Sequence, residues 1–268
     1  MSKPKIGMTE AGDAGWDLSW FEKLTKYDYD GAILITKSVS RPEFMEKVLE
    51  LNGDIPFVIH STITGWGGSI MEPMVPTPEK AVNAVRTLID KGIAANRFVL
   101  RIDPIYPTTE GIEKAQNVIR LAKEIIPDVT RIRVSIYDDY PESRAEICRR
   151  GLPPIDDNDK PKKELDRRPT PDQVKMVAEA LMEAAGESQR FECCAEPELA
   201  KAYPGKFFWF GCLSERDCDI MDIEVPEGTG INGQQRYGCR CLMLKQELLS
   251  HKRRCPNNCA YCYWGSNK

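Results

Sequence analysis

The sequence predicts an α/β fold, a partial (β/α)6 TIM-like barrel with a cysteine-rich, cluster-binding C-terminal region. Two observations lead to this prediction. Short apolar runs alternate with amphipathic helical stretches through the first two-thirds of the 268 residues, and nine of the ten cysteines follow residue 190. Alternating strands and helices are typical of a parallel sheet with helices packed against it.

Six segments have the pattern of strands. Several are near-continuous apolar runs, which is typical of strands covered on both faces. A closed eight-stranded barrel usually needs about 250 residues, and these units end close to residue 205, so we predict a partial barrel. A flat, doubly wound sheet is the alternative. The expected strands are Lys5–Glu10, Ala32–Lys37, Phe57–Thr62, Arg97–Ile102, Arg131–Tyr137 and Arg190–Ala195.

Helix start signals lie between these runs. Thr77 and Thr170 are each followed by a proline and an acidic residue. This order provides an N-cap hydroxyl, a proline at the first helical position and a favourable charge in the first turn. We therefore expect helices over Glu79–Lys91 and Asp172–Ala185, the second one ended by Gly186.

The pattern changes after Pro204. Residues 1–204 hold the expected barrel, whereas residues 205–268 have little periodic structure and contain seven of the ten cysteines. We expect this second segment to fold onto the barrel as an Fe–S-binding region and not to form a domain of its own. The segment Arg149–Pro169, rich in proline and charged residues, is expected to be an exposed loop.

Charge and hydropathy exclude several classes of protein. The formal net charge is -4 and no large basic patch is present, which argues against tight non-specific binding to nucleic acid. No apolar run approaches the roughly 20 residues that span a bilayer, and residues 1–16 do not resemble a secretory signal. We expect a cytoplasmic protein with no membrane partner, in which clustered cysteines bind metal and do not form disulfides.

The C-terminal cysteines have a distinctive spacing. Cys255, Cys259 and Cys262 form the pattern C-x3-C-x2-C. Thiolates are the usual ligands of iron–sulfur clusters, and three of them can hold three corners of a [4Fe-4S] cluster. No fourth cysteine follows locally, so one iron would stay open for another ligand, as in catalytic metal sites. A structural zinc site completed by His251 or a distant cysteine is the alternative.

This motif resembles that of the radical S-adenosylmethionine (SAM) superfamily, in which an aromatic residue, here Tyr261, precedes the last cysteine. The resemblance implies that the open iron binds SAM, and that reduction by flavodoxin or ferredoxin cleaves SAM to a 5′-deoxyadenosyl radical that abstracts hydrogen from a substrate. It also implies a (β/α)6 partial barrel. That superfamily usually places the motif after the first strand, so its position here implies a circularly permuted arrangement.

The chain is also similar to an uncharacterised bacterial and phage family over most of its length. The similarity includes a late C-x-C pair, a C-A-E triplet, a cysteine followed by aspartate, an R-x-D-P-I strand and a glycine-rich T-x-T-G-x-G segment. The N-terminus departs from that family, which has a basic run where this chain has Met8–Asp13. The matching segments here are Cys239–Cys241, Cys194–Glu196, Cys218–Asp219, Arg101–Ile105 and Thr62–Pro73.

A second group of cysteines, Cys194, Cys218, Cys239 and Cys241, has the number of thiolates that fills a second [4Fe-4S] cluster. Cys212 is a substitute for Cys218 in this prediction. Zinc binding or simple free thiols are the alternatives. Cys148 and Cys193 are expected to be ordinary small buried residues.

Polar residues at the ends of the expected strands are candidates for binding SAM. An arginine there can bind the SAM carboxylate through two hydrogen bonds, and the others can contact its ribose or amine. The alternatives are a buried core histidine and an Arg–Asp pair that only braces the barrel. The candidates are His60, Arg101, Asp103, Ser135, Tyr137 and Glu196.

We therefore predict a radical SAM enzyme. By similarity to radical SAM enzymes that act on thymine in DNA, including phage proteins, the specific prediction is an isomerase or lyase acting on a hypermodified thymine. Its substrate is a small molecule or nucleobase, with DNA as a further partner, and its location is the host cytoplasm if the chain is phage-encoded. The alternatives are an Fe–S electron-transfer protein and a zinc-stabilised binding module.

Overall fold

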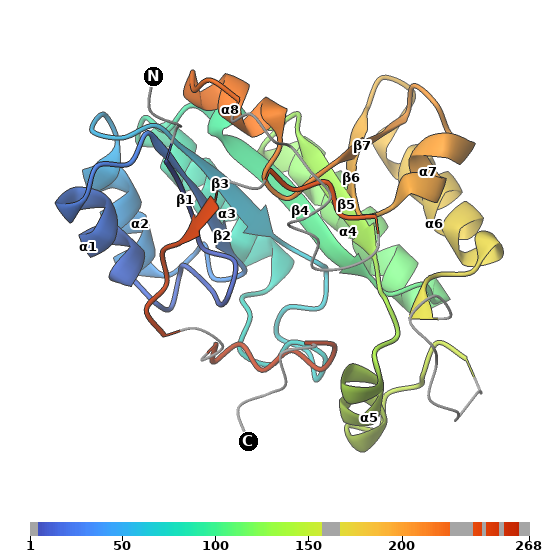
Figure 1. The fold of residues 1–268 in the computed structure, drawn as a ribbon. Helices are drawn as coiled ribbons and strands as arrows, with labels where there is room; N and C mark the ends of the chain where they lie inside the picture. The colour runs from blue at the N-terminus through green and yellow to red at the C-terminus, as the bar shows by residue number, and fades with distance from the viewer. Residues whose placement is uncertain (1–4, 157–166, 226–237, 243–244, 252–254, 263–268) are drawn as a thin grey trace.

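The structure is a computed structural model that describes residues 5–156, 167–225, 238–242, 245–251 and 255–262. Its centre is one parallel sheet of eight strands in the order β7-β6-β5-β4-β3-β2-β1-β8 (Figure 1). Six strands correspond to the predicted ones, and β7 and β8 come from the segment after residue 204. The strands are β1 (Ile6–Met8), β2 (Gly31–Thr36), β3 (Phe57–Thr62), β4 (Phe98–Ile105), β5 (Ile132–Ile136), β6 (Phe191–Cys194), β7 (Phe207–Phe210) and β8 (Lys245–Glu247).

The helices begin where the sequence signals place them. Thr77 accepts a hydrogen bond from the backbone of Lys80, Thr170 forms a full capping box with Gln173, and Gly186 ends its helix at φ 82°. None of the described helices is both long and apolar enough to cross a membrane. The helices are α1 (Ser19–Lys26), α2 (Pro42–Leu51), α3 (Pro78–Asp90), α4 (Thr109–Ile125), α5 (Pro141–Arg149), α6 (Pro171–Ala185), α7 (Pro197–Ala202) and α8 (Glu215–Met221), with a 3-10 turn at Ala95–Arg97.

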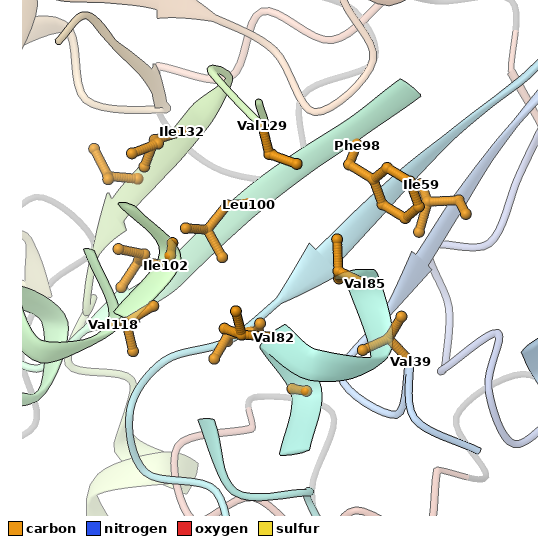
Figure 2. Packing of buried hydrophobic residues seen from close by; sticks show 14 of the residues in the cluster. Val39, Ile59, Val82, Val85, Phe98, Leu100, Ile102, Val118, Val129 and Ile132 are labelled. Carbon is orange, nitrogen blue, oxygen red and sulfur yellow. The ribbon is translucent and has the colours of Figure 1, made fainter. Parts of the chain in front are cut away.

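The consecutive strand order places the connecting helices on one face of the sheet, because crossovers between parallel strands are almost always right-handed. Alternate residues of β2 to β6 point to that face and form the main core with α1, α2, α3, α4, α6 and α7. Figure 2 shows Ile59 and Phe98 of the sheet packed with Val82 and Val85 of α3. A doubly wound sheet would cover both faces with crossover helices, so the alternative topology is not formed.

The opposite face of the sheet, here called the inner face, has layers of different chemistry. At the start of the strands a small apolar cluster packs against α8, with Ile6, Val58 and Val99 from the sheet and Cys218 and Met221 from the helix. The sheet is open, since β7 and β8 are its two edges and do not pair with each other. A closed barrel is therefore not formed, and what the structure establishes is an eight-stranded parallel α/β sheet flanked by helices.

A buried ionic network forms the next layer of the inner face. Arg131 of the loop before β5 bonds Glu192 of β6 at 2.8 Å and Asp217 of α8 at 2.7 Å. Arg133 of β5 bonds both acids as well, and the Nε2 atom of His60 lies 3.3 Å from Asp217. Burial of charged groups is favourable only when they are paired and hydrogen-bonded in this way. The network therefore fixes α8 against β5 and β6 on the inner face of the sheet.

His60 should make the stability of the protein depend on pH. Burial lowers the pKa of His60 to about 4, whereas an unfolded histidine titrates near 6.5. Between these two pKa values the unfolded chain binds a proton that the folded chain does not bind. The free energy of unfolding should therefore fall by about 3 kcal/mol as the pH drops from about 6.5 to about 4. Denaturant titrations of the wild type and His60→Gln at a series of pH values measure this slope.

The His60→Gln variant should lose most of that dependence. His251, the second histidine, is exposed in both proteins and cancels in the comparison. An equal slope in the two proteins would show that His60 is not held neutral.

Candidate functional site

A cavity of about 360 Å³ lies where the strands end on the inner face. The carboxyl ends of parallel strands meet at one edge of a sheet, and the loops that follow them surround that edge. The wall includes Lys37 after β2, Thr62 at the end of β3 and Tyr137 after β5. Seven of the ten cysteines also line it: Cys194, Cys212, Cys239, Cys241, Cys255, Cys259 and Cys262.

Cys255, Cys259 and Cys262 lie on one loop, here called the three-cysteine loop, which Asn257 anchors to the sheet. Asn257 is 1% exposed. Its amide donates to Asp13 at 2.7 Å, and its oxygen accepts from Trp16 at 2.8 Å and from Ser38 at 3.1 Å. These partners follow β1 and β2, so the loop is fastened over the ends of those two strands. Asn258 has φ 54°, a left-handed conformation that asparagine tolerates.

The other side of the three-cysteine loop lies against the loop that follows β3, as the red and cyan segments of Figure 1 show. The backbone of Ala260 donates to Met71 at 2.9 Å. The fully buried Glu72 accepts from Tyr261, from Lys37 at 2.9 Å and from Thr64 at 2.7 Å. Lys37, Glu72 and Tyr261 thus form one charged and hydrogen-bonded unit that fixes the last turn of the loop.

Burial makes two of the three thiols weak acids in the metal-free chain. It raises the pKa of Cys255 to about 12 and that of Cys259 well above its ordinary value. Cys262 is close enough to raise both of these pKa values further, and the positive Lys37 opposes this effect. Burial itself would lower the pKa of Lys37, but Glu72 raises it, so Lys37 stays charged. Metal binding would therefore release protons from these thiols.

The remaining cavity cysteines form a second group on the side of β6 and β7. The Sγ atoms of Cys194 and Cys212 are 3.1 Å apart, and those of Cys239 and Cys241 are 3.3 Å apart. The Cys212 amide donates to the Cys241 sulfur at 3.1 Å, which joins the two pairs. The hydrogen bond between Cys239 and Cys241 lowers the pKa of Cys239 to about 7.

Cys218 is not brought to this second group, and Cys212 stands in its place. Cys218 lies on α8, fully buried in the apolar cluster at the start of the strands. Cys193 is buried on the helix-covered face of β6, as expected for an ordinary core residue. Cys148 is exposed on α5, so the expectation that it is buried was wrong.

Three of the six SAM-binding candidates line the cavity, namely Arg101, Asp103 and Tyr137. Arg101 pairs with Asp103 and also donates to the sulfur of Cys212 at 3.7 Å. The hydroxyl of Tyr137 lies 2.8 Å from that of Ser143, and burial raises its pKa.

The other three candidates lie outside the cavity wall. His60 is one step deeper than Thr62 on the same face of β3 and belongs to the ionic network. The carboxylate of Glu196 accepts from the backbone of Ile136 at 2.9 Å and lies 3.4 Å from the hydroxyl of Ser135. Strand position identified the correct face for His60 and Ser135 but not the depth along it.

The described residues can bind a metal at the second group. One ligand atom each from Glu10, Cys212 and Cys241 lies within 4.8 Å of the others. Thiolates bind zinc and iron–sulfur clusters, so both cysteine groups have a suitable chemistry.

A family model described as a domain of unknown function, DUF1848, matches residues 21–264. The chain belongs to the DUF1848 family. No curated protein matches the chain. The match includes β2 to β8, both cysteine groups and Asn257, whereas β1 and Asp13 precede it.

Removal of the Asn257 side chain should loosen the three-cysteine loop. Asn257→Ala loses three hydrogen bonds with buried or part-buried partners, and each unmade bond of this kind costs about 1–3 kcal/mol. Cys259 is 7% exposed in the wild type. In the metal-free variant we expect alkylation of Cys259 to be at least about tenfold faster than in the metal-free wild type, equivalent to about 1.4 kcal/mol.

Mass spectrometry of the alkylated protein measures this rate, with the exposed Cys148 as an internal reference. Asn83→Ala on the surface of α3 is the matched control. An unchanged rate at Cys259 in Asn257→Ala would show that the anchor does not hold the loop.

Proposed function

We propose that this protein is a radical SAM enzyme whose SAM-binding [4Fe-4S] cluster is held by Cys255, Cys259 and Cys262. The observation that carries the proposal is the number of thiols available on each side of the cavity. The four other cavity cysteines contact one another, so the three-cysteine loop has three thiolates for one cluster. A cluster held by three thiolates keeps one iron open, as SAM binding requires.

The place of the three-cysteine loop in the sheet supports the same proposal. The loop follows β8, which is an edge strand beside β1. Counted across the sheet from that edge, β8 is the first strand, and the other seven follow in chain order from β1 to β7. The superfamily carries its motif after the first strand of a (β/α)6 partial barrel. A circular permutation of such a barrel would produce this arrangement.

The residues around the cavity have distinct roles in this proposal. When bound, the cluster supplies the electron that cleaves SAM to methionine and a 5′-deoxyadenosyl radical. Asn257 and the Lys37–Glu72–Tyr261 unit orient the three thiols. Tyr137, Arg101 and Asp103 are the proposed contacts of SAM, since they line the same cavity. The apolar cluster of Trp66, Met71, Tyr106 and Tyr137 beside Cys259 excludes water from that side.

The cavity volume is in the range of small-molecule sites, which suits SAM together with a small substrate or a single base. We propose a free or flipped hypermodified thymine as that substrate, with isomerisation or elimination as the reaction. DNA is then a partner only through the extruded base. Flavodoxin or ferredoxin is the proposed electron donor.

Cleavage of SAM tests the proposal. The protein, purified without oxygen and supplied with iron and sulfide, should form 5′-deoxyadenosine from SAM in the presence of dithionite. Cys259→Ala should reduce this product at least about a hundredfold, because one of the three cluster ligands is lost. Cys148→Ala, which removes an exposed thiol that does not line the cavity, should retain wild-type cleavage.

Two results would contradict the proposal. Full cleavage by Cys259→Ala would show that the three-cysteine loop does not hold the cluster. Zinc in place of iron at that loop, in protein prepared with iron in excess, would favour a zinc-stabilised binding module.

A further inference from the structure

We infer that Cys194, Cys212, Cys239 and Cys241 are the ligands of a second thiolate-bound metal centre in the same cavity. Four sulfur ligands select zinc or an iron–sulfur cluster. The inference is independent of SAM chemistry, because it rests on the contacts of these four cysteines and not on the three-cysteine loop. It differs from the sequence prediction in one ligand, since Cys212 replaces Cys218.

The first support is the convergence of four thiols, three of them buried and Cys212 part-buried, from three separate parts of the chain. Cys194 ends β6, Cys212 follows β7, and Cys239 and Cys241 lie just before β8. Their sulfur atoms make contacts of 3.1 and 3.3 Å, and a backbone amide bonds one of them. A disulfide needs about 2.05 Å, and none of the four cysteines is in a disulfide. Single cysteines that pack as small core residues do not account for four thiols in contact with one another.

The second support is a backbone built to allow this convergence. A Cβ at Gly211 would lie 2.5 Å from the nitrogen of Cys241 and 2.6 Å from the carbonyl of Arg240. Only glycine therefore lets residues 240–241 approach the end of β7. Trp209 donates to Gly238 at 2.8 Å, and Leu242 donates to Leu213 at 3.0 Å, so the two segments run side by side.

Cys194 is also held by an unusual turn. Ala195, the next residue, has φ 57°. A left-handed conformation is unfavourable for a residue with a Cβ. The turn leads from Cys194 into Glu196, which binds the backbone of β5. The chain keeps an unfavourable backbone conformation directly beside one of the four thiols, as is frequent at functional sites.

The third support is the positive charge that surrounds the group. Arg101, only 7% exposed, donates to the sulfur of Cys212 at 3.7 Å. The ionic network reaches the same residue, because Arg133 donates to the carbonyl of Cys212 at 2.8 Å. Four thiolates around a divalent metal, or around a four-iron cluster, carry excess negative charge. A nearby guanidinium offsets that charge and fixes the ligand that approaches it.

The two cysteine groups therefore differ in function. Four thiolates complete the coordination of zinc or of a cluster and leave no open position, as in structural or electron-transfer sites. Both cysteine groups line the same cavity, and Glu10, which follows β1, lies within 4.8 Å of Cys212 and Cys241. The second centre thus forms another part of the cavity wall that also contains the three-cysteine loop.

Metal content of single variants tests the inference. The full chain, prepared without oxygen and supplied with iron, sulfide and zinc, is analysed for each element. Cys194→Ala and Cys212→Ser should each lose one centre relative to the wild type, about four irons with their sulfide or about one zinc. The element that is lost identifies the metal. Cys193→Ala, the neighbouring residue on the opposite face of β6, and Cys218→Ala should keep the wild-type content.

Gly211→Ala provides a variant that removes no ligand. The added methyl group should displace residues 240–241 and lower the occupancy of the second centre at least about tenfold, measured by metal competition with a chelator, while circular dichroism shows a folded chain. Loss of metal from Cys218→Ala but not from Cys212→Ser would overturn the ligand set. Wild-type content in Cys194→Ala, Cys212→Ser and Gly211→Ala would overturn the centre itself.

Failure of this inference is distinguishable from failure of the proposed function. Cys259→Ala should keep the second centre and lose only the metal of the three-cysteine loop. If Cys259→Ala keeps all metal while Cys212→Ser loses a centre, the second site stands and the radical SAM proposal fails.

Discussion

The structure depends on one constraint, the strict alternation of side chains along parallel strands that follow one another across the sheet in chain order. Right-handed crossovers then place the connecting helices on one face, and the other face has to be covered by different means. Here α8 and the cysteine-bearing segments cover it. The inner face consequently changes from apolar at the start of the strands, through the ionic network of Arg131, Arg133 and Asp217, to the cysteine-lined cavity at their ends.

The end of the chain completes a site whose supports come from its beginning. Asp13, Lys37 and Glu72 lie in the first third of the sequence, whereas Asn257 and Tyr261 lie in the last few residues that the structure describes. These contacts form only when the whole sheet has assembled. Metal binding at the three-cysteine loop should therefore be coupled to folding of the complete chain, since a preformed site does not exist in the unfolded state.

Local sequence patterns predicted individual strands and helices. They did not predict features that depend on contacts between residues far apart in the chain. Apolar runs identified β1 to β6 because buried parallel strands are nearly continuous in apolar residues. The polar edge strand β8, Lys245–Glu247, has no such pattern. Cys212 and Cys218 are alike in sequence, and only the packing of α8 separates them. Asn257 and Glu72 carry no signal of their own, because their partners lie as far as 244 residues away. The aromatic run of β7, Phe207–Phe210, was a signal that would have revealed a further strand.

Electron paramagnetic resonance of the reduced protein can show whether Cys255, Cys259 and Cys262 hold a cluster with one open iron. Spectra are recorded after reduction with dithionite, with and without SAM, for the wild type and for Cys259→Ala. We expect a SAM-dependent change in the cluster signal of the wild type and none in the variant. A wild-type spectrum that SAM leaves unchanged, in protein that contains the cluster, would show that SAM does not bind an open iron at these three cysteines.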